Sequence, residues 1–490
     1  MTAGHPRRLR PADVGWRLGR AREPRGGELW VPWDRTAGVI GPQGSGKTLD
    51  LLVPALLDAP GAAMVTLTKV DDLLLSFDPR STGERPCVVL DPFGLVPGLP
   101  EAVWDPIRDC ADPLVAERRA KAFTAGTVKG AVAGGHGDAA ARFYAAEAAK
   151  VLQGFFHAAA LTGGSLDDVL RWVARPMAAT QPSEILREHP HAASFWDGLL
   201  HGALHGDDRT AGNTVTTVQQ AMSLFFQDDI RRRCVPGPGR PATAIADVIA
   251  ACGTIYVLGR EDPYASASPL MTAFAEHVLD TALEAANASP WGRLCPPFHA
   301  VLDELPSTAP LPTLRTRMAN ERALGISFIW AAQAWPQLAA IFGEQEARTL
   351  LGLTNNLIVF GGSKDVAFNK EISDLLGEVR VARTSWQSGR MGGRQMSGED
   401  IAILTPAEVR QLKERHALVL AENGAPIIAE LHRCVDGKAG RALLVGKDAL
   451  RAKVAVDRGH QVSPEARAAT ALVEARRSGL AGQDDGRSSE

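Results

Sequence analysis

The sequence predicts an α/β fold: a mostly parallel sheet with helices on both faces, interrupted by an inserted all-α domain. Seven short apolar runs are continuous rather than alternating, which is typical of strands buried on both faces. Helical stretches separate many of these runs, as in doubly wound folds. The strand pattern almost vanishes between Pro92 and Cys252. The seven runs are TAGVIG (36–41), AAMVTLT (62–68), CVVLDP (87–92), GTIYVLG (253–259), FHAVLDEL (298–305), ISFIWAAQ (326–333) and NNLIVFGG (355–362).

The composition is that of an ordinary globular protein. The 490-residue chain is 45% hydrophobic and 22% charged, so we expect a packed core and no global disorder. Its net charge of −3 excludes a global basic signature of nucleic-acid binding, so any such surface would be local. At ~100–200 residues per domain, the length corresponds to two to four domains, or to one large domain with an insertion.

The cysteines and the apolar runs indicate where the protein resides. None of the six cysteines forms a CxxC pair or a His/Cys cluster with metal-ligand spacing, so neither a disulfide framework nor a zinc site is expected. No run approaches ~18 consecutive apolar residues, so no transmembrane segment is predicted. The N-terminus lacks the apolar stretch of a secretory signal. We therefore expect a cytoplasmic protein.

Residues 1–35 are predicted as a basic N-terminal arm with a short hairpin around ELWVPW. Eight Arg stand against four acidic residues in this segment. A solvated arm is the simplest interpretation of such a charge run. Contact with nucleic acid or with an acidic lipid surface is the alternative.

Residues 36–112 are predicted as the first part of a nucleotide-binding domain, because GPQGSGKT (41–48) joins an apolar strand to a helix-like run. It matches the P-loop (Walker A) pattern G-x-x-x-x-G-K-[ST]; the alternative is an accidental Gly-rich turn. The glycines let backbone N–H groups face phosphates, the lysine neutralises the β/γ oxygens and the threonine hydroxyl reaches Mg²⁺. We predict that ATP and Mg²⁺ bind here, at Gly41, Pro42, Gln43, Gly44, Ser45, Gly46, Lys47 and Thr48.

Residues 113–245 are predicted as the inserted all-α domain. Stretches such as RFYAAEAAKVLQGFFHAAALTGG and NTVTTVQQAMSLFF show helical periodicity. The boundaries are the Pro/Gly-rich VPGPGRPATA (235–244) and a softer one near WDPIRDCADP (104–113). The second part of the nucleotide-binding domain follows at 246–445.

The run FHAVLDEL supplies the strongest candidate for the acidic half of an NTPase site. Such a site needs a carboxylate at the end of a neighbouring strand to hold the metal's water shell. Asp303 is predicted to orient Mg²⁺, and Glu304 to polarise the attacking water as a general base. Two solvated acids at a strand end are the alternative. Asp91, which also ends an apolar strand, ranks second because no Glu follows it.

The next strand brings a candidate sensor and candidate arginines. Gln333 ends ISFIWAAQ, where an amide beside the acidic strand can touch the γ-phosphate. Arg315, Arg317 and Arg322 precede the strand, and an arginine there could reach a neighbouring subunit's phosphate. Three solvated helix arginines are the alternative.

Three features are expected toward the C-terminus. RTSWQSGRMGGRQMSGED (383–400) is polar and rich in Gly, Ser and Arg, and is expected to be a mobile loop. HALVLAENGAPIIAEL (416–431) resembles a hairpin. Residues 446–490, rich in Ala, Arg, Ser and Asp, are expected to form a helix and then a disordered tail.

Over most of positions 15–435 the chain resembles the type IV secretion coupling proteins (the VirD4/TraG/TraD family), hexameric ATPases of bacterial conjugation. GPQGSGKT with LLVPALL is similar to that family's phosphate loop and first helix, and CVVLDPFG followed by WDPI to its next strand and signature. VLDEL and AAQAWPQL resemble its C-terminal half. FGEQEARTLLGLTNNLIVFGGSKD, with KEISDLLGE behind it, is the most family-specific segment.

The resemblance implies a RecA-like P-loop NTPase domain with Walker A and Walker B motifs, working as a homo-hexamer. Lys47 and Thr48 would bind nucleotide and Mg²⁺, and Asp303 and Glu304 would be the metal-orienting and catalytic acids. Arg322 matches the position of the trans-acting arginine. Gln333 matches the sensor. The helical insertion would meet a relaxase–DNA substrate, and the ring would pass single- or double-stranded DNA to the type IV secretion channel.

The chain departs from that family in two respects. The family usually has N-terminal transmembrane helices, whereas no transmembrane segment is predicted here, so peripheral association with a membrane partner at the inner face of the cell membrane is an alternative. It also usually has an Asp where Thr68 precedes Lys69. An FtsK/HerA-like duplex DNA translocase not linked to secretion is the second hypothesis. A small-molecule kinase or nucleotide-gated binding module is the third.

Overall fold

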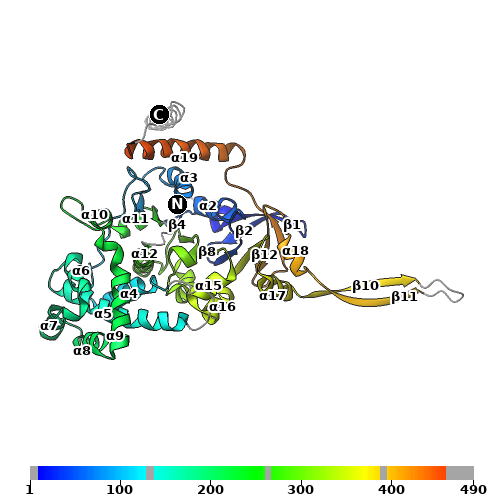
Figure 1. The fold of residues 1–490 in the computed structure, drawn as a ribbon. Helices are drawn as coiled ribbons and strands as arrows, with labels where there is room; N and C mark the ends of the chain where they lie inside the picture. The colour runs from blue at the N-terminus through cyan, green and yellow to red at the C-terminus, as the bar shows by residue number, and fades with distance from the viewer. Residues whose placement is uncertain (1–8, 129–136, 260–265, 387–393, 460–490) are drawn as a thin grey trace, which may run out of the picture.

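The structure is a computed structural model that describes residues 9–128, 137–259, 266–386 and 394–459. Its centre is an 11-stranded sheet with the order β2-β1-β13-β12-β9-β3-β8-β7-β4-β6-β5 (Figure 1). The strands are β1 (Gly15–Glu23), β2 (Glu28–Pro32), β3 (Ala37–Ile40), β4 (Ala63–Leu67), β5 (Cys87–Leu90), β6 (Thr254–Leu258), β7 (Phe298–Leu302), β8 (Ile326–Ala332), β9 (Asn356–Phe360), β12 (His416–Ala421) and β13 (Ile427–Glu430).

Each of the seven predicted apolar runs forms a strand, and these strands pair in parallel from β9 to β5. All residues of β3, β4 and β6 to β8 are buried, because helices cover both faces. Continuous Val, Ile, Leu and Ala runs suit strands that meet apolar side chains on both sides. The predicted fold class is confirmed.

Four antiparallel strands extend the sheet beyond β9. The predicted 416–431 hairpin is present as β12 and β13. Beside it, β1 pairs with β13 and with β2. The hairpin expected within 1–35 is therefore the edge of the sheet and not a solvated arm. Its tryptophans explain the difference, since the side chains of Trp16 and Trp33 pack into the core with exposures of 1% and 6%.

The helices between β5 and β6 form the left side of Figure 1. They do not enclose a core of their own, because Phe123 and Phe156 belong to the same apolar cluster as Ile255 of β6. The predicted limit at residue 245 falls on the first residue of the last helix. The helices are α4 (Pro113–Ala125), α5 (Gly137–Leu161), α6 (Leu166–Ala174), α7 (Gln181–Glu188), α8 (Trp196–His205), α9 (Asp208–Met222), α10 (Asp228–Cys234) and α11 (Ile245–Ala250).

The helices between β5 and β6 pack toward one face of the sheet. The other face is covered by α2 (Val53–Asp58), α3 (Val70–Arg80) and α19 (Gly437–Asp457). In Figure 1, α19 lies along α3. The helix expected from residue 446 begins at Gly437. The predicted boundary at residue 446 lies inside this helix, because Gly437, Gly440 and Gly446 weaken the helical signal in the sequence. The tail expected after it lies, from residue 460, outside the described residues.

The remaining helices connect strands of the sheet or precede it. They are α1 (Pro11–Val14), the π-helix η1 (Thr48–Leu52), α12 (Ser268–Ala288), α13 (Leu305–Thr308), α14 (Leu314–Asn320), the 3-10 turn η4 (Arg322–Leu324), α15 (Trp335–Phe342), α16 (Glu344–Gly352), α17 (Val366–Leu376) and α18 (Pro406–Arg410), with two further 3-10 turns, η2 (Pro176–Ala178) and η3 (Ser223–Phe226).

The mobile loop expected at 383–400 is largely a two-stranded antiparallel ribbon. Strands β10 (Glu378–Trp386) and β11 (Arg394–Ala402) pair in continuous register, and the ribbon extends away from the body of the molecule (Figure 1). Residues 387–393 of the expected loop lie outside the described residues. The strands were missed because the ribbon stands clear of the core, and residues 383–400 are mostly polar and lack the apolar alternation of a half-buried strand.

Candidate nucleotide-binding site

The carboxyl ends of β3, β8, β7 and β4 meet at one edge of the sheet, because these strands are parallel neighbours. Ligand sites of open α/β sheets lie at this edge. A cavity of about 470 Å³ opens there. It is lined by Gln43, Gly44, Ser45, Gly46, Lys47, Thr48, Leu49, Thr68, Lys69, Asp72, Asp303, Glu304, Gln333 and Arg433.

The phosphate loop leaves β3 and enters η1. Gly44 and Gly46 have φ angles of +79° and +99°, which favour glycine and turn the backbone around the cavity. Lys47 is 6% exposed, and its Nζ donates to the carbonyl oxygens of Gly41 and of Pro42, the latter at 3.2 Å. Burial lowers the pKa of this ammonium. The loop thus holds a desolvated cation beside the cavity.

Thr48, the first residue of η1, and Asp303, the residue after β7, come together. The Thr48 hydroxyl donates to Asp303 Oδ2 at 3.0 Å, and the Thr66 hydroxyl donates to the Asp303 carbonyl at 3.1 Å. Asp303 is 8% exposed, and burial raises the pKa of its carboxyl. A hydroxyl and a carboxylate are hard oxygen donors of the kind that Mg²⁺ prefers. These two residues fit the predicted metal role.

Glu304 and Gln333 complete this half of the cavity. Glu304 has φ +53°, a left-handed conformation that is uncommon for a non-glycine residue and clusters at functional sites. It precedes α13, so its backbone turns away from β7 directly after Asp303. Gln333 follows β8, which lies between β3 and β7, and its N–H donates to Gln337 Oε1 at 3.2 Å. Both side chains line the cavity with the phosphate loop.

Arg322 lies at the opposite edge of the sheet. It precedes the amino end of β8, whereas the phosphate loop follows the carboxyl end of the parallel strand β3. The seven residues of β8 separate the two edges by about 20 Å at ~3.3 Å per residue. The side chain is 42% exposed, and its Nη1 is 4.0 Å from Glu422 Oε1. Arg322 therefore cannot reach the nucleotide cavity of its own chain.

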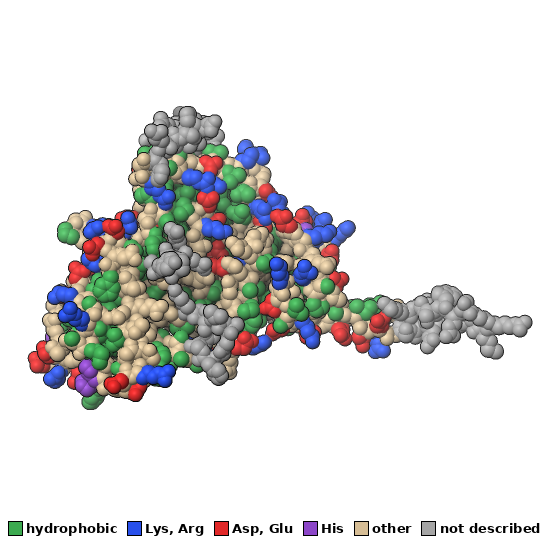
Figure 2. Space-filling model, in the orientation of Figure 1, with side chains coloured by type: hydrophobic (Ala, Val, Ile, Leu, Met, Phe, Trp, Pro, Cys, Tyr) green, Lys and Arg blue, Asp and Glu red, His purple; other side chains and the backbone are tan. Residues whose placement is uncertain are grey.

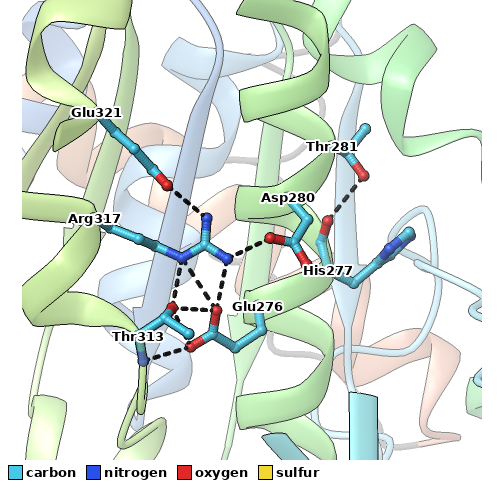
Figure 3. Close-up of polar contacts among 7 residues, drawn as sticks. All are labelled: Glu276, His277, Asp280, Thr281, Thr313, Arg317 and Glu321. Carbon is cyan, nitrogen blue, oxygen red and sulfur yellow. Dashed lines mark hydrogen bonds and ion pairs between the residues drawn. The ribbon is translucent and has the colours of Figure 1, made fainter. Parts of the chain in front are cut away.

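The other two arginines before β8 differ from each other. Arg315 is half-exposed and its Nε lies 3.0 Å from Glu346 Oε2. Arg317 is buried with a 6% exposed side chain, among Glu276, Asp280 and Glu321 (Figure 3). The idea that all three are solvated is wrong for Arg317, whose contacts also leave it unable to reach another subunit.

Asp91, the second candidate for the metal-orienting carboxylate, lies outside the cavity. It follows β5, the outermost strand of the parallel part of the sheet, and does not line the cavity. Its Oδ2 accepts a hydrogen bond from the backbone N–H of Val96 at 2.7 Å. The carboxylate stabilises the loop that follows β5.

Five cavity residues were missed from the sequence as site residues: Leu49 and Thr68, and the charged residues Lys69, Asp72 and Arg433. Lys69 could have been found, because it follows β4, whose end meets the same edge. Burial and the nearby Asp303 raise the pKa of Asp72 to about 6. Arg433 follows β13, the last strand of the sheet in the sequence, and no local sequence pattern marks it as a cavity residue.

A family model described as the "TraM recognition site of TraD and TraG" matches residues 297–414. This range contains Asp303, Glu304, Arg322 and Gln333. The predicted resemblance to the type IV secretion coupling proteins is confirmed. No curated protein sequence matches the chain.

Solved structures similar to this chain include several of the conjugative coupling protein TrwB. An unbound form is 21% identical, with a TM-score of 0.62 over 84% of this chain and 88% of that chain. TrwB with ADP and Mg²⁺ is 20% identical, with a TM-score of 0.59 over 83% and 87%. TrwB with the non-hydrolysable ATP analogue ADPNP gives the same values. The similarity shows that the coupling-protein fold extends over most of the chain.

In the part of the chain that the structure describes, no helix is both long and apolar enough to cross a bilayer.

Proposed function

We propose that this protein is an ATP-hydrolysing motor that works as a homo-hexamer and moves DNA, or a relaxase–DNA complex, toward a type IV secretion channel. The observation that carries the proposal is the meeting of Lys47, Thr48, Asp303, Glu304 and Gln333 around one cavity, within a chain whose segment 297–414 matches a coupling-protein family model. TrwB structures with ADPNP and with ADP and Mg²⁺ support the assignment of ATP and Mg²⁺ as ligands.

Five of the cavity residues have side-chain roles in the proposed hydrolysis. Lys47, which now donates to two loop carbonyls, turns to the β/γ oxygens when nucleotide enters. Thr48 and Asp303 hold Mg²⁺, which when bound neutralises charge on the phosphate oxygens. Glu304 takes a proton from the attacking water, and Gln333 orients that water or the γ-phosphate. The loop's backbone N–H groups supply fixed dipoles.

The proposed ring follows from the position of Arg322. Because this side chain lies about 20 Å from its own cavity by strand length, it can serve catalysis only in another subunit. There its planar guanidinium would stabilise the charge that develops on the transferring phosphoryl group. We infer that one subunit binds the nucleotide and the next supplies the arginine.

The partners in this proposal are DNA, relaxase and channel components. The matched family model is named for TraM recognition, which favours a relaxosome partner for residues 297–414. Figure 2 shows Lys and Arg interspersed with Asp and Glu on one face of the molecule, so electrostatic contact with DNA would be local. No comparison favours an FtsK/HerA-like translocase.

Subunit mixing tests the proposed mechanism. Lys47→Ala removes nucleotide binding but keeps Arg322, whereas Arg322→Ala keeps nucleotide binding but removes the arginine. A ring made of either variant alone should therefore be nearly inactive. Randomly mixed rings contain about one quarter of interfaces with an intact cavity facing an intact arginine. ATPase activity should therefore reappear on mixing, increase with protein concentration and increase with DNA. A mixture as inactive as its components would contradict action in trans, and wild-type activity in Lys47→Ala would contradict the ATPase itself.

A further inference from the structure

Arg433 lines the nucleotide cavity, although it follows β13, the last strand of the 11-stranded sheet in the sequence. Strand β13 runs antiparallel to β12 and ends opposite His416, at the edge where nucleotide would bind. The chain then passes beside η1, where the N–H of Cys434 donates to the carbonyl of Leu49 at 3.0 Å. The backbone at residue 433 is thereby fixed against the helix that follows the phosphate loop.

A buried carboxylate holds the Arg433 guanidinium in one orientation. Its Nε donates to Asp50 Oδ1 at 2.7 Å, and its Nη2 donates to Asp50 Oδ2 at 3.1 Å. The Asp50 side chain is fully buried, while that of Arg433 is 20% exposed. This fork-to-fork geometry is rigid and specific. Among the hydrogen bonds of the described residues, none uses Nη1, and Arg433 lines the cavity.

The guanidinium lies directly against the phosphate loop. A Cβ added to Gly46 would stand 3.1 Å from Arg433 Nη2 and 2.3 Å from Asp50 Oδ2. A buried anion so close to a phosphate-binding loop would repel phosphates if it were alone. Arg433 neutralises it, and the same guanidinium, whose Nη2 also lies 3.4 Å from Glu414 Oε1, borders the cavity.

The position of Asp50 on its helix indicates which end of the nucleotide Arg433 meets. Thr48 points to Asp303, at the metal and γ-phosphate end. Asp50 is two residues farther along η1, roughly half a turn, which places it on the opposite side of the helix start. Arg433 thus lies on the side of the loop away from Asp303, Glu304 and Gln333.

We propose that Arg433 is a nucleotide-binding residue that contacts the α-phosphate end of a nucleotide in its own subunit, and that Asp50 is its positioning residue. The inference rests on the proposed nucleotide role of the cavity. It assigns Arg433 a contact made equally in the ground state and in the transition state, unlike the contact proposed for Arg322. Loss of such a contact weakens binding and leaves the chemical step unchanged.

The test is the binding of a fluorescent ADP analogue with Mg²⁺, together with steady-state ATPase kinetics. Arg433→Gln should weaken ADP binding and raise KM for ATP, each about tenfold or more, as expected for loss of a hydrogen bond to a charged group. Its kcat should stay within about threefold of wild type. Arg433→Lys keeps the charge without the fork and should show a smaller loss of affinity.

The matched control is Arg415→Gln. Arg415 also pairs with an acid of the same segment, Asp436 at 2.7 Å, but it does not line the cavity. The affinity of the Arg415→Gln variant for ADP should equal that of wild type. Unchanged affinity in Arg433→Gln and Arg433→Lys would overturn the inference, as would a fall in kcat with affinity intact. If wild type binds ADP through Arg433 but does not hydrolyse ATP, the proposed function fails and this inference stands.

Discussion

Replacing Arg317 by Met should destabilise the protein far more than the same change two residues earlier. Arg317 Nη2 lies 2.8 Å from Glu276 Oε2 and 2.5 Å from Asp280 Oδ1, and Nη1 lies 2.9 Å from Glu321 Oε1 (Figure 3). These contacts join α12 to the end of α14. Met fills most of the same volume but leaves three acidic groups without their cation.

The magnitude follows from burial. The side chains of Arg317, Glu276 and Glu321 are only 6–7% exposed, and removing one partner of a buried ion pair costs about 3–5 kcal/mol. Protonation of the acids limits the cost, so it should be smaller at pH 5 than at pH 8. Arg315 and Glu346 are both more than half exposed, so Arg315→Met should cost about 0–1 kcal/mol.

Urea unfolding followed by tryptophan fluorescence measures the difference. At a slope of about 3 kcal/mol/M, Arg317→Met should lower the midpoint by roughly 1 M, and Arg315→Met by a few tenths at most. Midpoints are the quantity to compare, because a chain of this size need not unfold in two states. Equal midpoints for the two variants at pH 8 would refute the idea that the buried cluster stabilises α14.

Two further predictions concern single carboxyl groups. Glu304→Gln should bind ADP as wild type does and lose about 10²–10⁴-fold in ATP hydrolysis, because the general base is gone; a variant that keeps its kcat would show that another group accepts the proton. Burial raises the pKa of Glu321 to about 6. The folded state therefore holds this proton more tightly, so the stability that Glu321 contributes is full below about pH 4.5 and is lost as pH rises through 6. Relative to Glu321→Gln, wild type should gain about 2 kcal/mol between pH 7 and pH 4.5, and parallel pH profiles of the urea midpoint would contradict this.

The parallel part of the sheet was predictable because its information is local. Each strand from β3 to β9 is a continuous apolar run between turn residues, and burial on both faces demands that pattern. The same logic located Asp303, Glu304 and Gln333, since the ends of parallel neighbours meet at one edge. The phosphate loop was predicted from the spacing of Gly46, Lys47 and Thr48 together with the apolar strand before the motif and the helix-like run after it.

The parts that were missed depend on contacts between distant residues. Strand β1 pairs with β13, some 400 positions later, so nothing near Trp16 reveals that it lies in the sheet. Arg433 reaches Asp50 across a similar separation. The burial of Arg317 depends on acids of another helix, and Arg315, with the same local surroundings, is exposed. Sequence pattern identifies what one element must bury, but not which distant side chain will meet it.

The opposite positions of the phosphate loop and Arg322 also constrain how subunits assemble. The loop lies at the carboxyl edge of β3 and Arg322 before the amino end of β8, so an arginine that serves a neighbouring site must bring two different surfaces together. Contacts between two different surfaces are heterologous, and they close into a ring when the rotation per subunit allows it. In such a ring every interface holds one complete site, made of a cavity from one subunit and an arginine from the next. Hydrolysis would then report on the contact between neighbours, which is what a motor requires if each step is to be passed around the ring.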